Sequence, residues 1–285
     1  MRMAHIIMVH KDPDQLERLL KSLQHPAYDF YIHVDKKSDI QPFLRLSGIG
    51  QVYFIKNRHI CNWGGNSLFT TIVSCMNEAL RSGIPYDFIN LLSGQDYPVK
   101  SAEYIYNFFL QHPGVSFISC ESFEGSEWWE TAKDRYQHYH FTDWDFKGKY
   151  LLQKIVNAIM PIRKFPLSVP LYGGNKACWW TLSTDCASYV TTMLERNPAL
   201  RRFLKYCWAT DEFVIPTLIM SSPFSDKVMN NNYRYIDWSE GNAHPKILRR
   251  EDLGKMLAAD VLFARKFDRA VDALVLDQID AHIHQ

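Results

Sequence analysis

Two adjacent carboxylates, Asp211 and Glu212, are the side chains in this sequence best suited to acid–base chemistry. Apolar residues recur behind them at helical spacing, which predicts a helix over 211–220 with both carboxylates at its N-terminus. A carboxylate held there can act as a general base that removes a proton from an attacking hydroxyl group. Ordinary helix capping is the competing interpretation, and the two residues alone do not decide between them.

Cations that can hold an anion occur in two later segments. Arg265 and Lys266 interrupt an apolar segment, and Lys246 and Arg249 lie upstream of them. If the fold draws such side chains together, they can bind a diphosphate without a metal ion. A solvated surface charge is the competing role for each single Lys or Arg.

Three aspartates are further candidates for ligand or metal binding. Asp35 follows an apolar run that predicts a buried strand over 30–34. A carboxylate at the carboxyl end of a strand can bind a nucleotide base or ribose, although a turn uses Asp equally well. Asp143 and Asp145 form a D-x-D pattern, with which some sugar-transferring enzymes hold a divalent cation. The pattern is short and follows no predicted buried strand, so we expect no metal site there.

Composition argues against several classes of protein. The net charge is +1, so no overall field favours nucleic acid. The six cysteines are scattered without a C-x-x-C pair, which is typical of reduced thiols in the cytosol rather than of a disulfide or zinc framework. No run of about 18 apolar residues occurs and no signal peptide is recognisable. We therefore expect a cytoplasmic protein without an integral membrane segment, with peripheral attachment to the inner face of the membrane left open.

The elements that must position these residues alternate between strands and helices in the first hundred residues. Apolar runs predict buried strands over 4–9, 30–34, 52–55 and 88–92. Asp12, Pro13 and Gln15 predict an N-cap with a capping box, and helical spacing predicts a second helix over 67–81. This alternation predicts an α/β fold with a central, mostly parallel mixed sheet flanked by helices, and ligands at the carboxyl ends of its strands.

Regular patterns weaken between residues 120 and 170 and then return. The weak stretch is aromatic and charged, a composition typical of functional loops. A strand is predicted over 179–182, a helix over 184–196 and further helix after 250.

The order of these segments resembles that of the core-2/I-branching β-1,6-N-acetylglucosaminyltransferases and the related peptide O-xylosyltransferases, glycosyltransferase family 14. The segments that carry the resemblance are Val9–Lys11, Tyr31–Ser38, Trp63–Gly65, Phe88–Lys100, Gly173–Ser183, Asp211–Glu212 and Phe263–Asp268. Phe88–Lys100 is the most specific of them. The similarity runs from Met3 to about Asp280 and is poorest between Cys120 and Pro170.

The resemblance implies a GT-A-type fold and transfer of a sugar, with inversion, from a UDP-sugar donor to a hydroxyl group of a glycan or glycolipid acceptor. Neither a metal ion nor another cofactor is implied. N-acetylglucosamine is the sugar we expect, with xylose as the alternative. We expect one domain over 1–285, with a nucleotide-binding half over 1–118 and an acceptor-binding and catalytic half over 119–285. The lack of a predicted anchor and of paired cysteines favours a bacterial relative acting on a polysaccharide.

The resemblance also implies roles on the donor side. Glu212 matches the family's catalytic base, Lys266 a lysine that contacts the donor diphosphate, and Asp35 the aspartate that recognises uridine. The second diphosphate contact, an arginine in the family, is matched by Lys246 or, with a short alignment gap, by Arg249.

The remaining implied positions are less closely matched. Val9 falls on the donor side. Glu127 and Arg135 fall where the family binds its acceptor, and Trp180 and Asp211 complete the predicted acceptor-binding set.

Two other functions stay open at this point. A metal-dependent transferase would use Asp143 and Asp145. A non-catalytic glycan-binding module would use aromatic side chains such as Trp128, Trp129 and Trp180 to stack on sugars.

Overall fold

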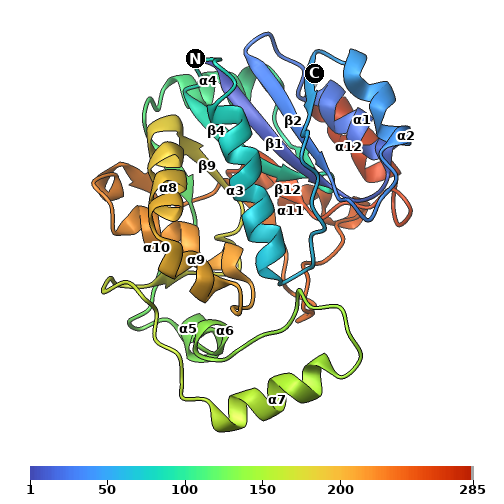
Figure 1. Cartoon of the computed structure of the whole chain (residues 1–285). Helices are drawn as coiled ribbons and strands as arrows, with labels where there is room; N and C mark the ends of the chain where they lie inside the picture. The colour runs from blue at the N-terminus through green and yellow to red at the C-terminus, as the bar shows by residue number, and fades with distance from the viewer. Residues whose placement is uncertain (284–285) are drawn as a thin grey trace.

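The computed structural model describes residues 1–283, in which helices cover both faces of a seven-stranded sheet (Figure 1). The strand order is β3-β2-β1-β4-β9-β6-β10. The strands are β1 (Met3–Val9), β2 (Tyr28–Val34), β3 (Gln51–Phe54), β4 (Phe88–Ser93), β6 (Ser116–Ile118), β9 (Trp180–Ser183) and β10 (Val228–Met229). Only β9 runs antiparallel to its neighbours. The predicted α/β class and the mostly parallel mixed sheet are confirmed.

The helices divide between two hydrophobic cores, one on each face of the sheet. The first core receives α3 (Asn66–Leu80), α8 (Thr184–Arg196), α9 (Pro198–Leu204) and α10 (Val214–Met220). The second receives α1 (Pro13–Ser22), α2 (Gln41–Leu44), α4 (Ala102–Leu110), α11 (Leu253–Ala258) and α12 (Leu274–Ile283). All seven residues of β1 are buried, because side chains that alternate along this central strand enter both cores.

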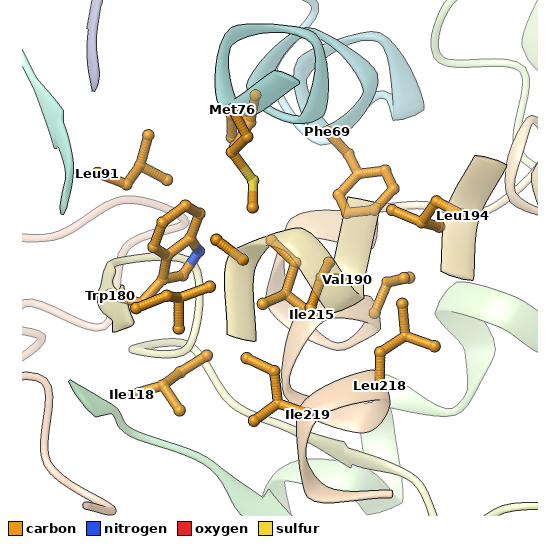
Figure 2. Packing of buried hydrophobic residues seen from close by; sticks show 14 of the residues in the cluster. Phe69, Met76, Leu91, Ile118, Trp180, Val190, Leu194, Ile215, Leu218 and Ile219 are labelled. Atoms are coloured by element: carbon orange, nitrogen blue, oxygen red, sulfur yellow. The ribbon is translucent and has the colours of Figure 1, made fainter. Parts of the chain in front are cut away.

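Figure 2 shows the first core. Phe69 and Met76 of α3 point toward the side chains of α8 and α10, and Trp180 of β9 lies among them. Trp180 is fully buried there, so its ring cannot stack on a glycan. Its predicted role in acceptor binding is therefore wrong, because alternation along β9 turns this side chain into the core.

Smaller elements complete the fold around the sheet. A three-stranded sheet is ordered β11 (Arg234–Ile236), β12 (Phe263–Arg265), β5 (Asp96–Pro98), and β7 (Glu121–Ser122) pairs with β8 (Tyr172–Gly173). The segment between β7 and β8 carries the helices α5 (Glu127–Ala132), α6 (Asp134–Gln137) and α7 (Lys149–Ile159). Short 3₁₀ turns occupy Arg45–Gly48, Thr210–Glu212, Ser225–Lys227 and Arg250–Asp252.

Two local predictions are wrong in ways that matter for the site. The helix expected over 211–220 is interrupted: a 3₁₀ turn ends at Glu212, Phe213 has φ −138°, and α10 begins only at Val214. The predicted capping box of α1 does not form, although Asp12 accepts a hydrogen bond from the Gln15 amide at 2.9 Å. The side-chain amide of Gln15 instead donates to two distant carbonyl groups, at 2.8 and 3.2 Å, that belong to Gly94 and Phe267.

The long segment between β7 and β8 is fastened to the body through Asp143. Its carboxylate accepts hydrogen bonds from Ser67 N (2.9 Å), Ser67 Oγ (2.5 Å) and Asn62 Nδ2 (3.2 Å). Gly65, the N-cap of α3, makes no capping bond of its own, so Asp143 supplies the acceptor that the first turn requires. A Cβ atom at Gly65 would lie 2.1 Å from Asp143 Oδ1, so glycine is required for this contact.

Replacing Asp143 with alanine should lower the free energy of unfolding by about 1–2 kcal/mol, because α3 loses its cap. Urea denaturation followed by circular dichroism would measure the change. Asp145→Ala is the matched control, since that side chain is exposed, and it should leave stability unchanged. Stabilisation of the parent protein, but not of Asp143→Ala, by Mn²⁺ or Mg²⁺ would instead restore the metal interpretation of the D-x-D pattern.

Candidate functional site

A cavity of about 460 Å³ opens at the carboxyl ends of β1, β2 and β4. It is lined by Val9, Asp35, Asp211, Glu212 and Lys266, which come from both halves of the chain. The structure thus brings together residues that the sequence proposed separately for donor binding and for catalysis. This edge of a mostly parallel sheet is where ligands of α/β proteins usually bind.

Asp35 presents a carboxylate whose position is held by the backbone. One oxygen accepts a hydrogen bond from Lys37 N at 2.9 Å, and the other accepts from Cys61 N at 3.3 Å. The first amide belongs to the turn after β2 and the second to the segment after β3. The carboxylate is therefore fixed at the cavity wall while its remaining lone pairs can accept bonds from a ligand.

Glu212 and Asp211 occupy the 3₁₀ turn that precedes α10. The carboxylate of Glu212 forms a charge-assisted ion pair with Arg135. The guanidinium group of Arg135 is sandwiched between two indole rings, 4.8 Å from the centre of Trp128 and 4.7 Å from that of Trp208. This cage of two rings and one carboxylate fixes the cation and, through it, the orientation of Glu212.

Burial changes the proton affinity of both carboxylates. It raises the pKa of Glu212 to about 7; Arg135 opposes this shift and the neighbouring charge of Asp211 adds to it. Burial also raises the pKa of Asp211, which Arg135 and Arg265 oppose. A carboxylate whose pKa lies near neutrality is well matched to accepting a proton from a hydroxyl group.

Lys266 is the cation best placed to meet an anionic ligand. Within residues 1–283 its ammonium group has no ion-pair or hydrogen-bond partner. Burial lowers the pKa of Lys266, and the charges of Arg265 and Lys11 lower it further. A half-buried cation without a partner creates a local demand for negative charge that the protein itself does not meet.

Arg265 also lines the cavity, although the family resemblance assigned a diphosphate contact in this segment to Lys266 alone. Its Nε donates to Asp96 Oδ1 at 2.9 Å across the β12–β5 pair, and its guanidinium group lies 3.9 Å from the centre of the Trp179 ring. Arg265 is thus a rigid second cation beside Lys266. The signal was its place next to Lys266 in an apolar segment, but the sequence does not show which of the two cations has an acid partner.

The two alternatives for a second diphosphate contact lie outside the cavity wall. Lys246 Nζ donates to Asp252 Oδ1 at 2.6 Å, and Arg249 is exposed on the surface. The residues before Lys246, which are Ala243, His244 and Pro245, line the cavity instead. In this structure the Lys and Arg side chains on the cavity wall are therefore Arg265 and Lys266, from β12 and the residue after it, and Lys37, from the turn after β2, rather than those of the segment over 244–250.

Of the predicted acceptor-binding residues, some lie at the cavity and others lie away from it. Arg135 contacts Glu212 directly, whereas Glu127 is exposed at the start of α5 and does not line the cavity. Trp179 lines the cavity instead of the buried Trp180. Trp63 and Trp208 line it too, with their rings edge to face at 5.7 Å.

The glycine after Trp63 explains how these rings meet. Gly64 has φ +68°, and a Cβ atom there would lie 2.3 Å from Nε1 of Trp208. Its carbonyl group accepts a hydrogen bond from Ala209 N at 2.7 Å. The backbone after Trp63 therefore closes directly onto the segment that leads to Asp211 and Glu212, and only glycine permits that approach.

No group of three or more His, Cys, Asp or Glu side chains suited to a metal ion occurs in the part of the chain that the structure describes. Neither Asp143 nor Asp145 lines the cavity. Among residues 1–283, no helix is long and apolar enough to cross a membrane.

Two solved structures align with this chain at low TM-scores and low identity. Mouse xyloside xylosyltransferase 1, in its apo form, aligns with a TM-score of 0.39 and 11% identity over 92% of this chain and 97% of that one. Staphylococcus aureus TarS in complex with UDP-GlcNAc aligns with a TM-score of 0.31 and 15% identity over 44% of this chain and 36% of that one.

Curated relatives are xylosyltransferases of animals. Xylosyltransferase oxt of Drosophila melanogaster is 26% identical over 95% of this chain and 32% of its own length. Xylosyltransferase 2 of Homo sapiens is 26% identical over 99% of this chain and 34% of its own length. The chain thus spans about a third of the length of these relatives.

The sequence model of the Core-2/I-Branching enzyme family matches residues 3–261, which is most of the chain. Lys266 lies just beyond the last matched residue, so its role depends on the geometry described above. The match confirms the resemblance and, together with the observed sheet, the expected GT-A-type α/β fold. The chain belongs to the Core-2/I-Branching enzyme family.

Proposed function

We propose that this protein is an inverting, metal-independent glycosyltransferase that moves a sugar from a UDP-sugar to a hydroxyl group of a glycan or glycolipid acceptor. One observation carries the proposal. The carboxylate of Glu212, whose pKa burial raises to about 7, lines the same cavity as the Lys266 cation, which has no ion-pair partner within residues 1–283. Sugar transfer from a nucleotide diphosphate needs both a proton acceptor and a group that stabilises the departing diphosphate.

In the proposed reaction, the acceptor oxygen attacks the anomeric carbon on the face opposite the diphosphate. The new carbon–oxygen bond forms while the bond between the anomeric carbon and the diphosphate oxygen breaks, and its electron pair leaves with UDP. Glu212 takes the proton of the acceptor hydroxyl group. Lys266 and Arg265 offset the charge that develops on UDP, by about a few kcal/mol for each preorganised contact.

The other cavity residues bind and orient the substrates in this proposal. Asp35 accepts hydrogen bonds from the uridine, and its backbone-held carboxylate limits how the base can sit. Arg135 positions Glu212 and keeps part of its population ionised. The exposed ring of Trp63 offers a flat surface to a sugar at the cavity mouth.

The donor sugar has two candidates. N-acetylglucosamine is the sugar expected from the core-2/I-branching resemblance, and xylose is the sugar in the names of the animal relatives. N-acetylglucosamine carries a hydroxymethyl group on C5 and an acetamido group on C2, where xylose has a hydrogen atom and a hydroxyl group, so a direct comparison of donors separates the candidates.

Incubating the protein with UDP-N-acetylglucosamine, UDP-xylose, UDP-glucose and UDP-galactose should release UDP from one donor. The rate should not change with EDTA, because protein cations rather than a metal offset the leaving charge. Release of UDP is measured with a coupled assay. Loss of activity on chelation would contradict metal independence. If no donor gives UDP and titration detects no UDP binding, the glycan-binding module becomes the better interpretation.

The pH profile should report the ionisation of Glu212. Because only the ionised carboxylate accepts a proton, kcat/KM should fall tenfold per unit as pH drops below about 7. Asp211→Asn should move this limb to lower pH, since the charge of Asp211 raises the pKa of Glu212. Arg135→Met should move it to higher pH, since Arg135 lowers that pKa.

Glu212→Gln is the control for that profile. It should reduce kcat by about 10²–10⁴ and abolish the limb, while UDP binding is retained. Near-normal turnover in Glu212→Gln would assign the proton acceptor to another group. The same conclusion would follow if neither Asp211→Asn nor Arg135→Met moved the acidic limb of the pH profile.

Lys266→Met should weaken UDP binding about tenfold to a hundredfold, the value of a hydrogen bond to a charged group. Isothermal titration calorimetry with UDP measures the change. Lys246→Met is the matched control, because Lys246 is already paired with Asp252, and it should change the affinity less than about threefold. The reverse order of effects would place the diphosphate near residues 244–250 instead.

A further inference from the structure

Helix α7 (Lys149–Ile159) is attached to the protein by its polar face. Lys149, Gln153 and Asn157 recur every four residues and therefore share one side of the helix. Lys149 Nζ donates to the Trp144 carbonyl group at 2.8 Å, and Gln153 Oε1 accepts from Phe141 N at 2.9 Å. Asn157 accepts from the backbone amide of Tyr139 at 2.8 Å and donates to its carbonyl group at 2.9 Å. These bonds fix the helix against the backbone of residues 139–144.

The opposite face of α7 is apolar and turned toward solvent. Leu151, Ile155 and Ile159 are 66%, 50% and 74% exposed, and no residue of the helix is buried. The apolar surface continues past the helix end through the exposed Met160 and Ile162. Figure 1 shows α7 at the edge of the molecule farthest from the N-terminus, beyond α5 and α6. The apolar side of an ordinary surface helix faces the core, so the orientation of α7 is the reverse of the usual one.

Most of the charge around this face has one sign, because Asp145 is the one acidic residue within residues 144–164. Between Phe146 and Lys164 the chain has no Asp or Glu, whereas the chain as a whole has a net charge of only +1. Lys147, Lys154 and Lys164 are exposed in this segment. Exposed aromatic rings, those of Trp144, Phe146 and Tyr150, lie at the start of the helix. Aliphatic side chains bordered by lysines and aromatic rings are the composition of a helix that lies in a membrane interface.

We propose that α7 and its flanks (residues 144–164) dock the protein on the surface of an anionic lipid bilayer, with the helix lying in the plane of the membrane. A helix of 11 residues is about 16 Å long, too short for a hydrocarbon layer of about 30 Å. Its apolar side chains enter the acyl boundary, and its lysines meet the lipid phosphates. A second copy of the chain fits less well, because a symmetric contact would bring the same lysines together.

One end of the docking surface, at Trp144, is connected to the cavity wall through the segment of Tyr206 and Trp208. The ring of Tyr206 contacts those of Tyr139, Phe141 and Trp144, and Trp208, two residues later, lines the cavity. Membrane docking itself does not depend on the proposed transfer reaction, and UDP binding tests that reaction separately.

Cosedimentation with vesicles tests the proposal. The protein should sediment with vesicles of phosphatidylcholine and phosphatidylglycerol, far less with phosphatidylcholine alone, and less as salt is raised. The triple variant Leu151→Gln, Ile155→Gln, Ile159→Gln should bind at least about a hundredfold more weakly, because three apolar side chains no longer enter the bilayer. The double variant Leu110→Gln, Leu274→Gln is the matched control, since both leucines are about half exposed elsewhere, and it should bind like the parent.

The triple variant should keep its melting temperature and its affinity for UDP, because the replaced side chains face solvent away from the cavity. Equal sedimentation of the parent and the triple variant would overturn the proposal, as would failure of the parent to bind anionic vesicles. A concentration-dependent dimer that the triple variant loses in sedimentation without lipid would assign the face to a second copy instead. A large fall in melting temperature would show that the face is buried and also overturn the proposal.

Discussion

The burial of strand β1 on both faces is the constraint from which the rest of the structure follows. Its one strongly polar side chain, His5, meets Asn90 at 2.9 Å, and burial lowers its pKa to about 3, so the imidazole is neutral. A central strand that presents no charge can pack a helical layer on each face. Asp29 of β2 pairs with Arg2 near the opposite edge, whereas Asp35 follows β2 at the edge where the parallel strands end. That edge holds Asp35 and the cavity, which explains why ligand-binding chemistry gathers there.

Concentrating carboxylates at this edge has a cost to stability. The folded-state pKa of Glu212, about 7, lies above its ordinary value of 4.5, so folding favours the protonated form. The stabilising contribution of this group is present below about pH 4.5 and is lost as pH rises through about 7. Arg135 reduces the penalty through its ion pair, and Trp128 and Trp208 hold Arg135 in place. The aromatic rings around the site thus serve to keep a desolvated charge pair in one geometry.

Helix α7 obeys a different rule from the other helices. α1, α3 and α8 bury their apolar residues, whereas α7 uses its polar residues to attach and leaves its apolar face free. Its periodicity alone would have predicted a helix packed on the core. The contacts of Gln153 and Asn157 with the backbone of residues 139–144 decide the opposite orientation, which is visible only in three dimensions.

Local signals were sufficient for much of the fold. Apolar runs located the central strands to within a few residues, the helix over 184–196 was predicted with its observed bounds, and Asp12 caps α1 as expected. Strands buried on both faces and helices with one apolar side have patterns that neighbouring residues alone define. The order of polar segments likewise pointed to Asp35, Glu212 and Lys266, which one cavity brings together.

Contacts between residues far apart in the chain decided the features of the site that local signals did not predict. The sequence by itself predicted a strand beside Trp179 and Trp180, which the structure begins at Trp180, and it showed that Arg265 and Lys266 interrupt an apolar segment. Only the tertiary structure decided that Trp180 enters the core while Trp179 lines the cavity. It also decided that Asp252 pairs with Lys246 while Lys266 stays without a partner among the described residues. The physical reason is that a charge or a ring acquires its role from what lies opposite it, and those neighbours come from segments far apart in the chain.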